Sequence, residues 1–311
     1  VRAADSEPLQ LNRWTHFVGT FDGSELKLYR DGVLVGTKPT SAAIPEGNEQ
    51  ILIGRRWDFN NTVRGRLDEV AMYRAALPAS RVQAHFDCAT NSCDYDAAVR
   101  DDNPAGYWRL GDASGGSAAN EIADTGSGTY VGAKSLGGEG ATHDGNGSVA
   151  LNGGYVDLVN SPELRSSHWT VEGWIYPTQQ PDNGATIITE AYNGDGNVRF
   201  ALGTGDDAGN RVWVGFYNGG WLRAVDQLDL ELNRWTYFAG TFDGTALTLY
   251  RDGSQVSTTA VTSPSPNGTE NIYIGRRWDL MQTIKGSVDE VAIYPEALTN
   301  ERILDHFLSA R

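Results

Sequence analysis

The sequence predicts an all-β protein, a two-sheet antiparallel jelly-roll sandwich that occurs as a tandem repeat with short C-terminal helical turns. Three observations support this prediction. Many short runs are rich in β-branched and aromatic residues and alternate between apolar and polar positions. Asp-Gly pairs, which favour hairpin turns, separate several of these runs. Segments with a helical period are almost absent, and 37 of the 311 residues are glycine.

One stretch of the chain occurs twice. It reads Ile-Leu-Ile-Gly-Arg-Arg-Trp-Asp at 51–58 and Ile-Tyr-Ile-Gly-Arg-Arg-Trp-Asp at 272–279. A constant offset of 221 residues relates the two copies, as it relates Trp14 to Trp235. Over the 76 positions from residue 11 to 86, 41 residues are identical to their equivalents. Identity at this level implies one fold that is used twice.

The repeat divides the chain into unequal parts. Because Val1 aligns with Leu222, residues 1–87 are predicted to be the C-terminal part of a first domain. Residues 88–96 are predicted to be a linker, and residues 97–311 a complete second domain. We therefore expect further domains of the same polypeptide upstream. Half of a sheet domain exposes strand edges and apolar faces, so the first part is expected to be poorly stable alone.

The first predicted strands of each copy are joined by Asp-Gly turns. They cover residues 14–21, 26–29 and 33–35, and the first two have equivalents at 235–242 and 247–250.

The repeated motif predicts a strand, then a loop with two arginines and a tryptophan, then a second strand that begins with Asp-Glu. In the first copy these strands are 51–53 and 68–73, with equivalents at 272–274 and 289–294. A short helix follows at 81–86 and 302–307, and Thr299 is its expected N-cap in the second copy.

The part of the second copy without a counterpart contains a long glycine- and serine-rich stretch. Residues 113–147 are predicted to be mainly loop. Further strands are predicted at 148–151, 155–158, 169–176, 185–190, 198–202 and 211–217.

Charge and composition narrow the classes of partner. The formal net charge is −15, which disfavours nucleic acid and anionic membranes because their phosphates would be repelled. No apolar run approaches the ~20 residues that a membrane helix needs.

The two cysteines, Cys88 and Cys93, are close enough in sequence to form a small disulfide in an oxidising compartment. They lack the second pair of a zinc site, and two free thiols are the alternative.

An ordered set of motifs indicates a known family. The set includes Gly-Tyr-Trp-Arg-Leu-Gly-Asp at 106–112, Trp-Thr-Val-Glu-Gly-Trp-Ile at 169–175, Leu-Tyr-Arg-Asp-Gly at 249–253 and Val-Asp-Glu-Val-Ala-Ile-Tyr at 288–294. It resembles the laminin-G-like jelly-roll domains of the concanavalin A-like lectin and glucanase superfamily. The resemblance covers the second copy end to end and the first from Trp14 onward. It implies an extracellular or cell-surface module that binds sugars, proteins or calcium.

Catalysis is not expected. Relatives of this fold include glycoside hydrolases that carry carboxylates at alternate positions of one inner strand. The strand that begins at Val288 has no such alternating pair, and we expect Asp289 and Glu290 to point to opposite faces of the sheet.

The resemblance implies a structural calcium ion. Its candidate side-chain ligands are Asp124, in the N-terminal loop, and Asp289, in the final strand, with backbone carbonyls completing the oxygen shell. The alternative is that Asp124 caps a turn and Asp289 accepts backbone hydrogen bonds.

The loops of the repeated motif are the candidate ligand contacts, because an indole offers a flat face to a sugar ring and arginine binds hydroxyls or carboxylates. Tyr217 and Trp221 are candidates for a second aromatic platform. In the alternative, the loop tryptophan packs over the sheet edge and the arginines pair with nearby acids. The loop candidates are Arg55, Arg56 and Trp57 in the first copy, and Arg276, Arg277, Trp278 and Asp279 in the second.

These observations lead to one expectation and two alternatives. We expect a non-catalytic module of a larger extracellular protein that binds carbohydrate, through tryptophan and arginine, with a glycan or a protein surface as partner. The alternatives are a structural or adhesion repeat that interacts with proteins, and an accessory module of a glycoside hydrolase.

Overall fold

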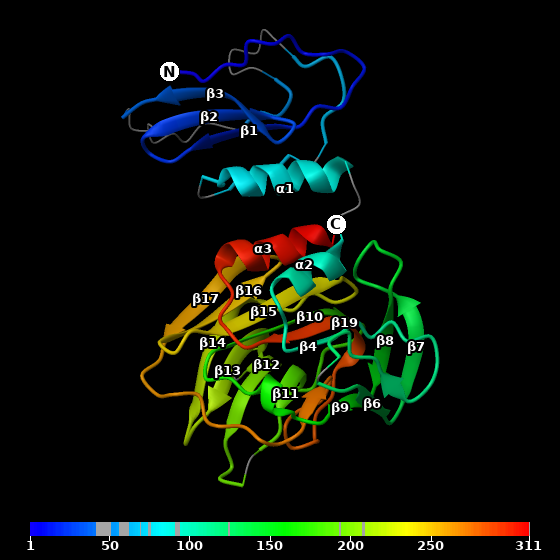
Figure 1. Ribbon diagram of the computed structural model, residues 1–311. Coiled ribbons are helices and arrows are strands. Elements are labelled where there is room, and N and C mark those ends of the chain that lie inside the picture. The colour runs from blue at the N-terminus through cyan, green and yellow to red at the C-terminus, as the bar shows by residue number, and fades with distance from the viewer. Residues whose placement is uncertain are drawn as a thin grey trace. The chain divides into compact units, whose positions relative to one another are not determined.

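The computed structural model describes residues 1–41, 51–55, 62–68, 70–73, 76–90, 94–123, 125–192, 194–206 and 209–310. The chain forms two compact units, Val1–Ser92 (unit 1) and Cys93–Arg311 (unit 2). The antiparallel sheets confirm the predicted all-β sandwich class, and short helices accompany them (Figure 1). Among the described residues, no helix is long and apolar enough to cross a membrane.

Unit 2 contains two antiparallel sheets of eight strands each. In sheet I the order is β17-β16-β15-β10-β19-β8-β7, and β4 also pairs with β19. Its strands are β4 (Gly106–Trp108), β7 (Lys134–Glu139), β8 (Gly147–Asn152), β10 (Trp169–Pro177), β15 (Thr236–Phe242), β16 (Ala246–Arg251), β17 (Ser254–Ala260) and β19 (Lys285–Tyr294). In sheet II the order is β14-β13-β12-β11-β18-β9-β6-β5. Its strands are β5 (Ser117–Ala118), β6 (Gly128–Val131), β9 (Tyr155–Leu158), β11 (Thr186–Glu190), β12 (Val198–Asp206), β13 (Gly209–Tyr217), β14 (Trp221–Asp229) and β18 (Ile272–Ile274).

The main core of unit 2 lies between the two sheets, because alternate residues of each strand point to the same face. Phe200 and Val214 of sheet II share this core with Phe238 and Leu249 of sheet I, and all four are fully buried. A single 3₁₀ turn, Pro162–Leu164, also contributes to it.

The outer face of sheet I is covered by two helices. They are α2 (Tyr95–Asp101) and α3 (Asn300–Ser309), and Figure 1 shows them over the strands of sheet I. Val99 and Ile303 of these helices are buried in a second apolar cluster. The predicted N-cap is confirmed, since the Thr299 side chain accepts a hydrogen bond from the backbone N–H of Arg302.

Three of the strands lie in the stretch that the sequence predicts to be mainly loop. β5, β6 and β7 all fall within residues 113–147, and that prediction is therefore wrong in part. Glycine and serine weaken an isolated strand, but here each strand pairs with a neighbour of higher β-propensity, such as β8 or β9.

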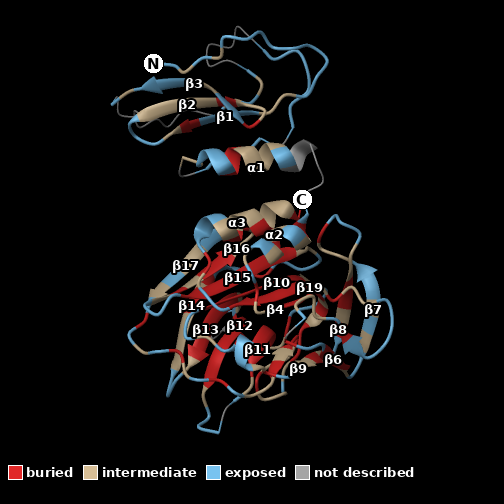
Figure 2. Cartoon of the chain, in the orientation of Figure 1, coloured by how far each residue is buried: buried red, intermediate tan, exposed pale blue. Residues whose placement is uncertain are grey.

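The described part of unit 1 contains one three-stranded antiparallel sheet, β1 (Phe17–Phe21), β2 (Glu25–Arg30) and β3 (Val33–Pro39), and the helix α1 (Ala79–Thr90). The predicted helix at 81–86 is thus confirmed and is longer than expected. Figure 2 shows that buried residues are dense on the strands of unit 2 and sparse in unit 1.

The repeated motif has different secondary structure in the two units. Residues 272–274 and 289–294 are strands, as predicted, whereas none of the described residues among 51–53 and 68–73 is in a strand. The prediction of strands at 51–53 and 68–73 is therefore wrong, whereas those at 14–21, 26–29 and 33–35 are confirmed by β1, β2 and β3. A strand needs a neighbour to satisfy its backbone N–H and C=O groups, and strand formation depends on that context more than on sequence.

Candidate ligand-binding site

The outer face of sheet II carries aromatic and cationic side chains instead of a helical cover. On β13, Val212 and Val214 point into the core, so the alternation places Trp213 on the outer face. On β14, Leu222 packs against the core, so Trp221 and Arg223 are outward. One face of this sheet thus belongs to the main core, and the other carries aromatic and cationic side chains.

The tryptophans of this face form one cluster with the loop after β18. The ring centroids of Trp221 and Trp278 are 4.6 Å apart, and those of Trp213 and Trp221 are 5.1 Å apart. Tyr217 and Tyr192 contact the edge of the cluster at 5.6 Å from Trp221 and 6.0 Å from Trp278. These separations are typical of aromatic pairs, so the rings hold one another in fixed orientations.

Trp213 forms the base of the cluster and requires a glycine beneath it. A Cβ at Gly203, the residue paired with Trp213 on β12, would lie 2.4 Å from the indole ring. The indole nitrogen Nε1 donates a hydrogen bond of 2.9 Å to the carbonyl oxygen of Gly205. The buried indole is therefore locked in position and supports the more exposed Trp221 above it.

A hollow of about 410 Å³ lies beside the two outer indoles. Its size is within the range of small-molecule sites. Gly184 forms part of its wall, where a Cβ would lie 3.3 Å from Nη1 of Arg277. The hollow is lined by Asn183, Gly184, Gly205, Trp221, Arg223, Arg277, Trp278 and Gln282.

The polar groups of the hollow are held in defined places. The guanidinium of Arg223 lies between two indoles, 4.3 Å from the ring centroid of Trp213 and 4.5 Å from that of Trp221. Arg277 pairs with Asp279, with 2.7 Å between Nε and Oδ1. The side-chain Oε1 of Gln282 is buried and has no hydrogen-bond partner among the described residues. A buried acceptor without a partner is costly, so this amide is suited to a ligand that donates a hydroxyl hydrogen.

The structure brings most of the predicted contacts of unit 2 together. Trp221, Arg277 and Trp278 line the hollow, Tyr217 adjoins it, and Asp279 orients Arg277. Trp278 is only 7% exposed, so Trp221 offers more accessible ring surface.

Other predicted contacts lie elsewhere. Arg276 is directed away, toward the carbonyl oxygen of Leu280 and the ring of Tyr155. Arg55 forms an isolated bridge with Thr62, as Arg276 does with Thr283. Arg56 and Trp57 lie outside the described residues, as do Cys93, the side chain of Cys88 and Asp124.

Sequence reasoning missed Arg223, Gln282 and Asn183. The alternation on β13 and β14 is a signal that could have placed Trp213 and Arg223 on one face. Gln282 and Asn183 come from loops, and nothing in their sequence context marks them.

The acidic pair at Asp289 and Glu290 does not alternate as expected. Glu290 has a φ of 50°, and the register between β10 and β19 shifts at this point, which is a β-bulge. Both carboxylates consequently face the β7–β8 loop. Asp289 accepts from the backbone N–H of Ala141 at 2.7 Å, and Glu290 accepts from the side chain of Asn146 at 3.1 Å. The prediction of opposite faces is therefore wrong.

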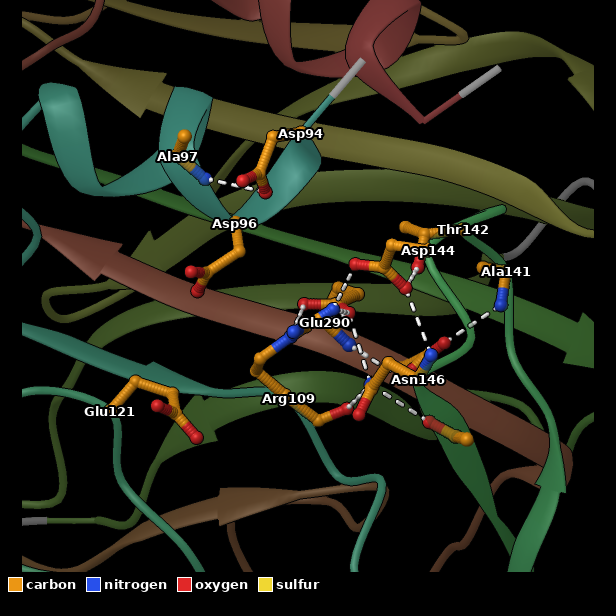
Figure 3. Close-up of polar contacts among 12 residues, drawn as sticks. Asp94, Asp96, Ala97, Arg109, Glu121, Ala141, Thr142, Asp144, Asn146 and Glu290 are labelled. Carbon is orange, nitrogen blue, oxygen red and sulfur yellow. Dashed lines mark hydrogen bonds and ion pairs between the residues drawn. The ribbon is translucent and has the colours of Figure 1, made fainter. Parts of the chain in front are cut away.

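Arg109 is the cation of this acidic cluster, as Figure 3 shows. It lies between Glu290, at 2.8 Å from Nη2 to Oε1, and Asp144, which it also contacts. Burial raises the pKa of Glu290 to about 7, although the contacts with Arg109 and Tyr107 oppose the rise. Burial and the neighbouring Glu290 raise the pKa of Asp289 well above its usual range.

The described residues do not by themselves fit a calcium shell. Each carboxylate oxygen of Asp289 accepts a backbone hydrogen bond, from Ala141 and from Glu290. Within the described part of the chain, no three acidic, histidine or cysteine side chains converge on one point. A second hollow of about 720 Å³ adjoins the cluster, but glycine backbone from residues 137–147 forms much of its wall.

Comparisons with known proteins identify the family and the fold. A sequence model described as the concanavalin A-like lectin/glucanases superfamily matches residues 1–83 and 150–304. No curated protein sequence is significantly similar to the chain.

Several solved structures share the fold. Domain 4 of AbnA, a GH43 extracellular arabinanase from Geobacillus stearothermophilus solved with arabinotriose, is 21% identical, with a TM-score of 0.51 over 67% of this chain and 98% of that domain. A Trypanosoma rangeli sialidase is 14% identical, with a TM-score of 0.51 over 66% of this chain and 32% of the sialidase. The receptor-binding domain of a botulinum neurotoxin mosaic serotype C/D is 12% identical, with a TM-score of 0.51 over 66% and 50% of the two chains. At these identities the likeness is one of fold.

Proposed function

The chain belongs to the concanavalin A-like lectin/glucanase superfamily, and from this premise we propose that it is a non-catalytic module that binds carbohydrate. The proposed site is the outer face of sheet II in unit 2. We propose further that the module acts outside the cell or at its surface, as part of a larger protein. The observation that carries the proposal is the hollow beside Trp221, which combines a supported indole face with an amide acceptor.

The chemistry of the hollow suits a sugar. The C–H face of a sugar ring is apolar and can stack on Trp221, which loses little conformational entropy because its neighbours already fix it. Hydroxyl groups around the ring can donate to Gln282 and accept from Arg277, and such a few convergent polar groups set orientation. The arabinanase domain of the same fold was solved with arabinotriose, so a pentose oligosaccharide is a suitable first probe.

The arabinanase comparison also favours a second candidate function. That domain is one part of a glycoside hydrolase, which is consistent with this chain being an accessory module that directs an enzyme to its polysaccharide. The site is the same in both cases. The two differ only in whether a catalytic domain accompanies the module, which the complete reading frame of the source protein would decide.

The test of the site is the variant Trp221→Ala. We expect its affinity for arabinotriose, or for the best ligand on a glycan array, to fall at least tenfold, because truncation removes the stacking face. Isothermal titration calorimetry measures the change, and Trp221→Phe is expected to retain part of the affinity.

A matched control is Trp235→Ala, which removes another partly buried indole of unit 2, one that packs on Tyr176 and borders the larger hollow. We expect its affinity to match that of the original protein. Loss of binding in Trp235→Ala but not in Trp221→Ala would move the site to the larger hollow. A glycan array blank for every sugar would instead support an adhesion repeat.

Calcium stays a prediction of the family resemblance. If Asp289 holds an ion together with Asp124, calcium at 100 times its Kd is expected to stabilise unit 2 by about 2.7 kcal/mol, and Asp289→Asn to abolish the response. Thermal unfolding of EGTA-treated protein, with and without calcium, measures this. An unchanged Tm would leave Asp289 with a structural role, the acceptance of backbone hydrogen bonds from Ala141 and Glu290.

A further inference from the structure

Unit 1 exposes side chains whose equivalents in unit 2 are core. Ile53 is 64% exposed and its equivalent, Ile274, is 0% exposed. The same contrast holds at eight further aligned positions, with exposures of 41–76% in unit 1 and 0–3% in unit 2. The exposed set, here called the open face, comprises Leu9, Phe17, Ile51, Ile53, Val63, Leu67, Val70, Met72 and Tyr73.

Unit 2 shows which strands flank these positions in its two sheets. Ile274 pairs with Ile188 of β11 and Val156 of β9. β19 pairs with β10, β8 and β4. All these flanking strands fall within residues 106–190, a region with no equivalent among residues 1–92 at the offset of 221.

The backbone of unit 1 is incomplete in the same way as its side chains. β15 has two neighbours in sheet I, β10 and β16, whereas its equivalent β1 pairs only with β2 among the described residues. The open edge of β1 is therefore the edge at which β10 lies in unit 2. An unpaired strand edge is a template for the addition of another strand.

The local contacts of unit 1 nevertheless follow the pattern of unit 2. Arg30 pairs with Asp5 at 2.7 Å, as Arg251 pairs with Asp226 at 2.7 Å. Asp31 and its equivalent Asp252 both have positive φ, of 50° and 48°. Unit 1 thus has the same local contacts as unit 2, and it differs from unit 2 at the positions that pair with strands of residues 106–190.

We infer that the open face of unit 1 is a docking surface for a polypeptide segment with the strand pattern of residues 94–221. Such a segment would add a strand beside β1, cover the open face, and allow residues 51–53 and 70–73 to form the strands seen in unit 2. A second copy of unit 1 fits less well, because it offers the same half of the sandwich and no equivalent of β10 or β11. This inference is independent of the proposed sugar site.

The test joins residues 94–221 of this chain directly ahead of Val1, which keeps the offset of 221 and raises the effective concentration of the segment. Hydrogen exchange is followed by mass spectrometry in the fused and original chains. We expect the amides of residues 17–21, 51–53 and 70–73 to gain at least tenfold protection in the fused chain. The amides of unit 2 are expected to exchange as before.

The variant Ile53→Asp is the matched control. In the original chain its side chain is exposed, so Tm is expected to stay within a degree of the parent. In the fused chain it places a charge in the new core, and the protection is expected to be lost. Equal protection with and without the substitution would overturn the inference.

A second measurement applies if the fused chain fails to fold. A peptide of residues 167–178, which spans β10, is added to the original chain, and amide shifts at residues 17–21 are expected to change. Absence of both the peptide shifts and the gain in protection overturns the inference. Dimerisation of the original chain, with protection of the open face, also overturns it, because a second copy would then be the occupant.

Discussion

Replacing His306 with alanine is expected to lower the free energy of unfolding of unit 2 by about 3–5 kcal/mol at pH 6, since it leaves the buried carboxylate of Glu172 without its cation. Nδ1 of His306 lies 3.0 Å from Oε2 of Glu172, and Nε2 lies 3.0 Å from Oδ2 of Asp102. Glu172 is fully buried and also accepts hydrogen bonds from Tyr237 and Tyr294. The network joins α3 to the outer face of sheet I.

The contribution of His306 depends on pH. Burial opposes its charge, but attraction to Glu172 and the hydrogen bond with Asp102 outweigh burial and raise the pKa of His306 to about 9. The pKa is about 6.5 in the unfolded chain. The stabilisation is therefore complete below about pH 6.5, is lost as pH rises toward about 9, and amounts to about 3 kcal/mol.

The variant His306→Gln isolates this effect, because glutamine is similar in size and does not titrate. The difference in unfolding free energy between the original protein and this variant is expected to shrink between pH 6.5 and 9. Urea unfolding at several pH values, with exchange of unit 2 amides as the probe, measures it. A difference that stays constant over this range would show that His306 acts by packing alone.

The equivalent histidine of unit 1 shows why the sequence could not reveal this network. His85 aligns with His306, yet burial lowers the pKa of His85 to about 4, and its Nε2 has no hydrogen-bond partner among the described residues. Histidine at the same position of the helix thus has a lowered pKa in unit 1 and a raised pKa in unit 2. What differs is the residues packed against it, Glu172 and Asp102, neither of which has an equivalent in unit 1 at this offset.

Fold class followed from local patterns, because alternation and Asp-Gly turns depend on neighbouring residues. The tryptophan-and-arginine loop at 276–279 was located for the same reason. Two features depended on distant residues and were missed. They are the bulge at Glu290 and the strands between 113 and 147. Alternation separates the faces of a strand, but only tertiary structure shows which face the helices cover.

The same substitution at two aligned isoleucines, Ile274 and Ile53, is expected to have very different effects on stability. Ile274→Ala should lower the free energy of unfolding of unit 2 by about 2–5 kcal/mol, because it leaves a cavity in the core between the two sheets. Ile53→Ala removes the same side chain from an exposed site, so its effect should stay within about 0.5 kcal/mol. Urea unfolding with amide exchange assigned to each unit compares them.

The comparison separates burial from sequence as the source of stability. Both isoleucines stand in the same Ile-Gly-Arg-Arg-Trp-Asp motif, so intrinsic propensity and the residues that follow are matched. Of the two, only Ile274 has strands on both sides of it among the described residues. A large loss for Ile53→Ala in the original chain would mean that the open face is already covered in solution. A small loss for both would mean that the cavity in unit 2 collapses, since the cost of a lost methylene depends on how far its surroundings relax.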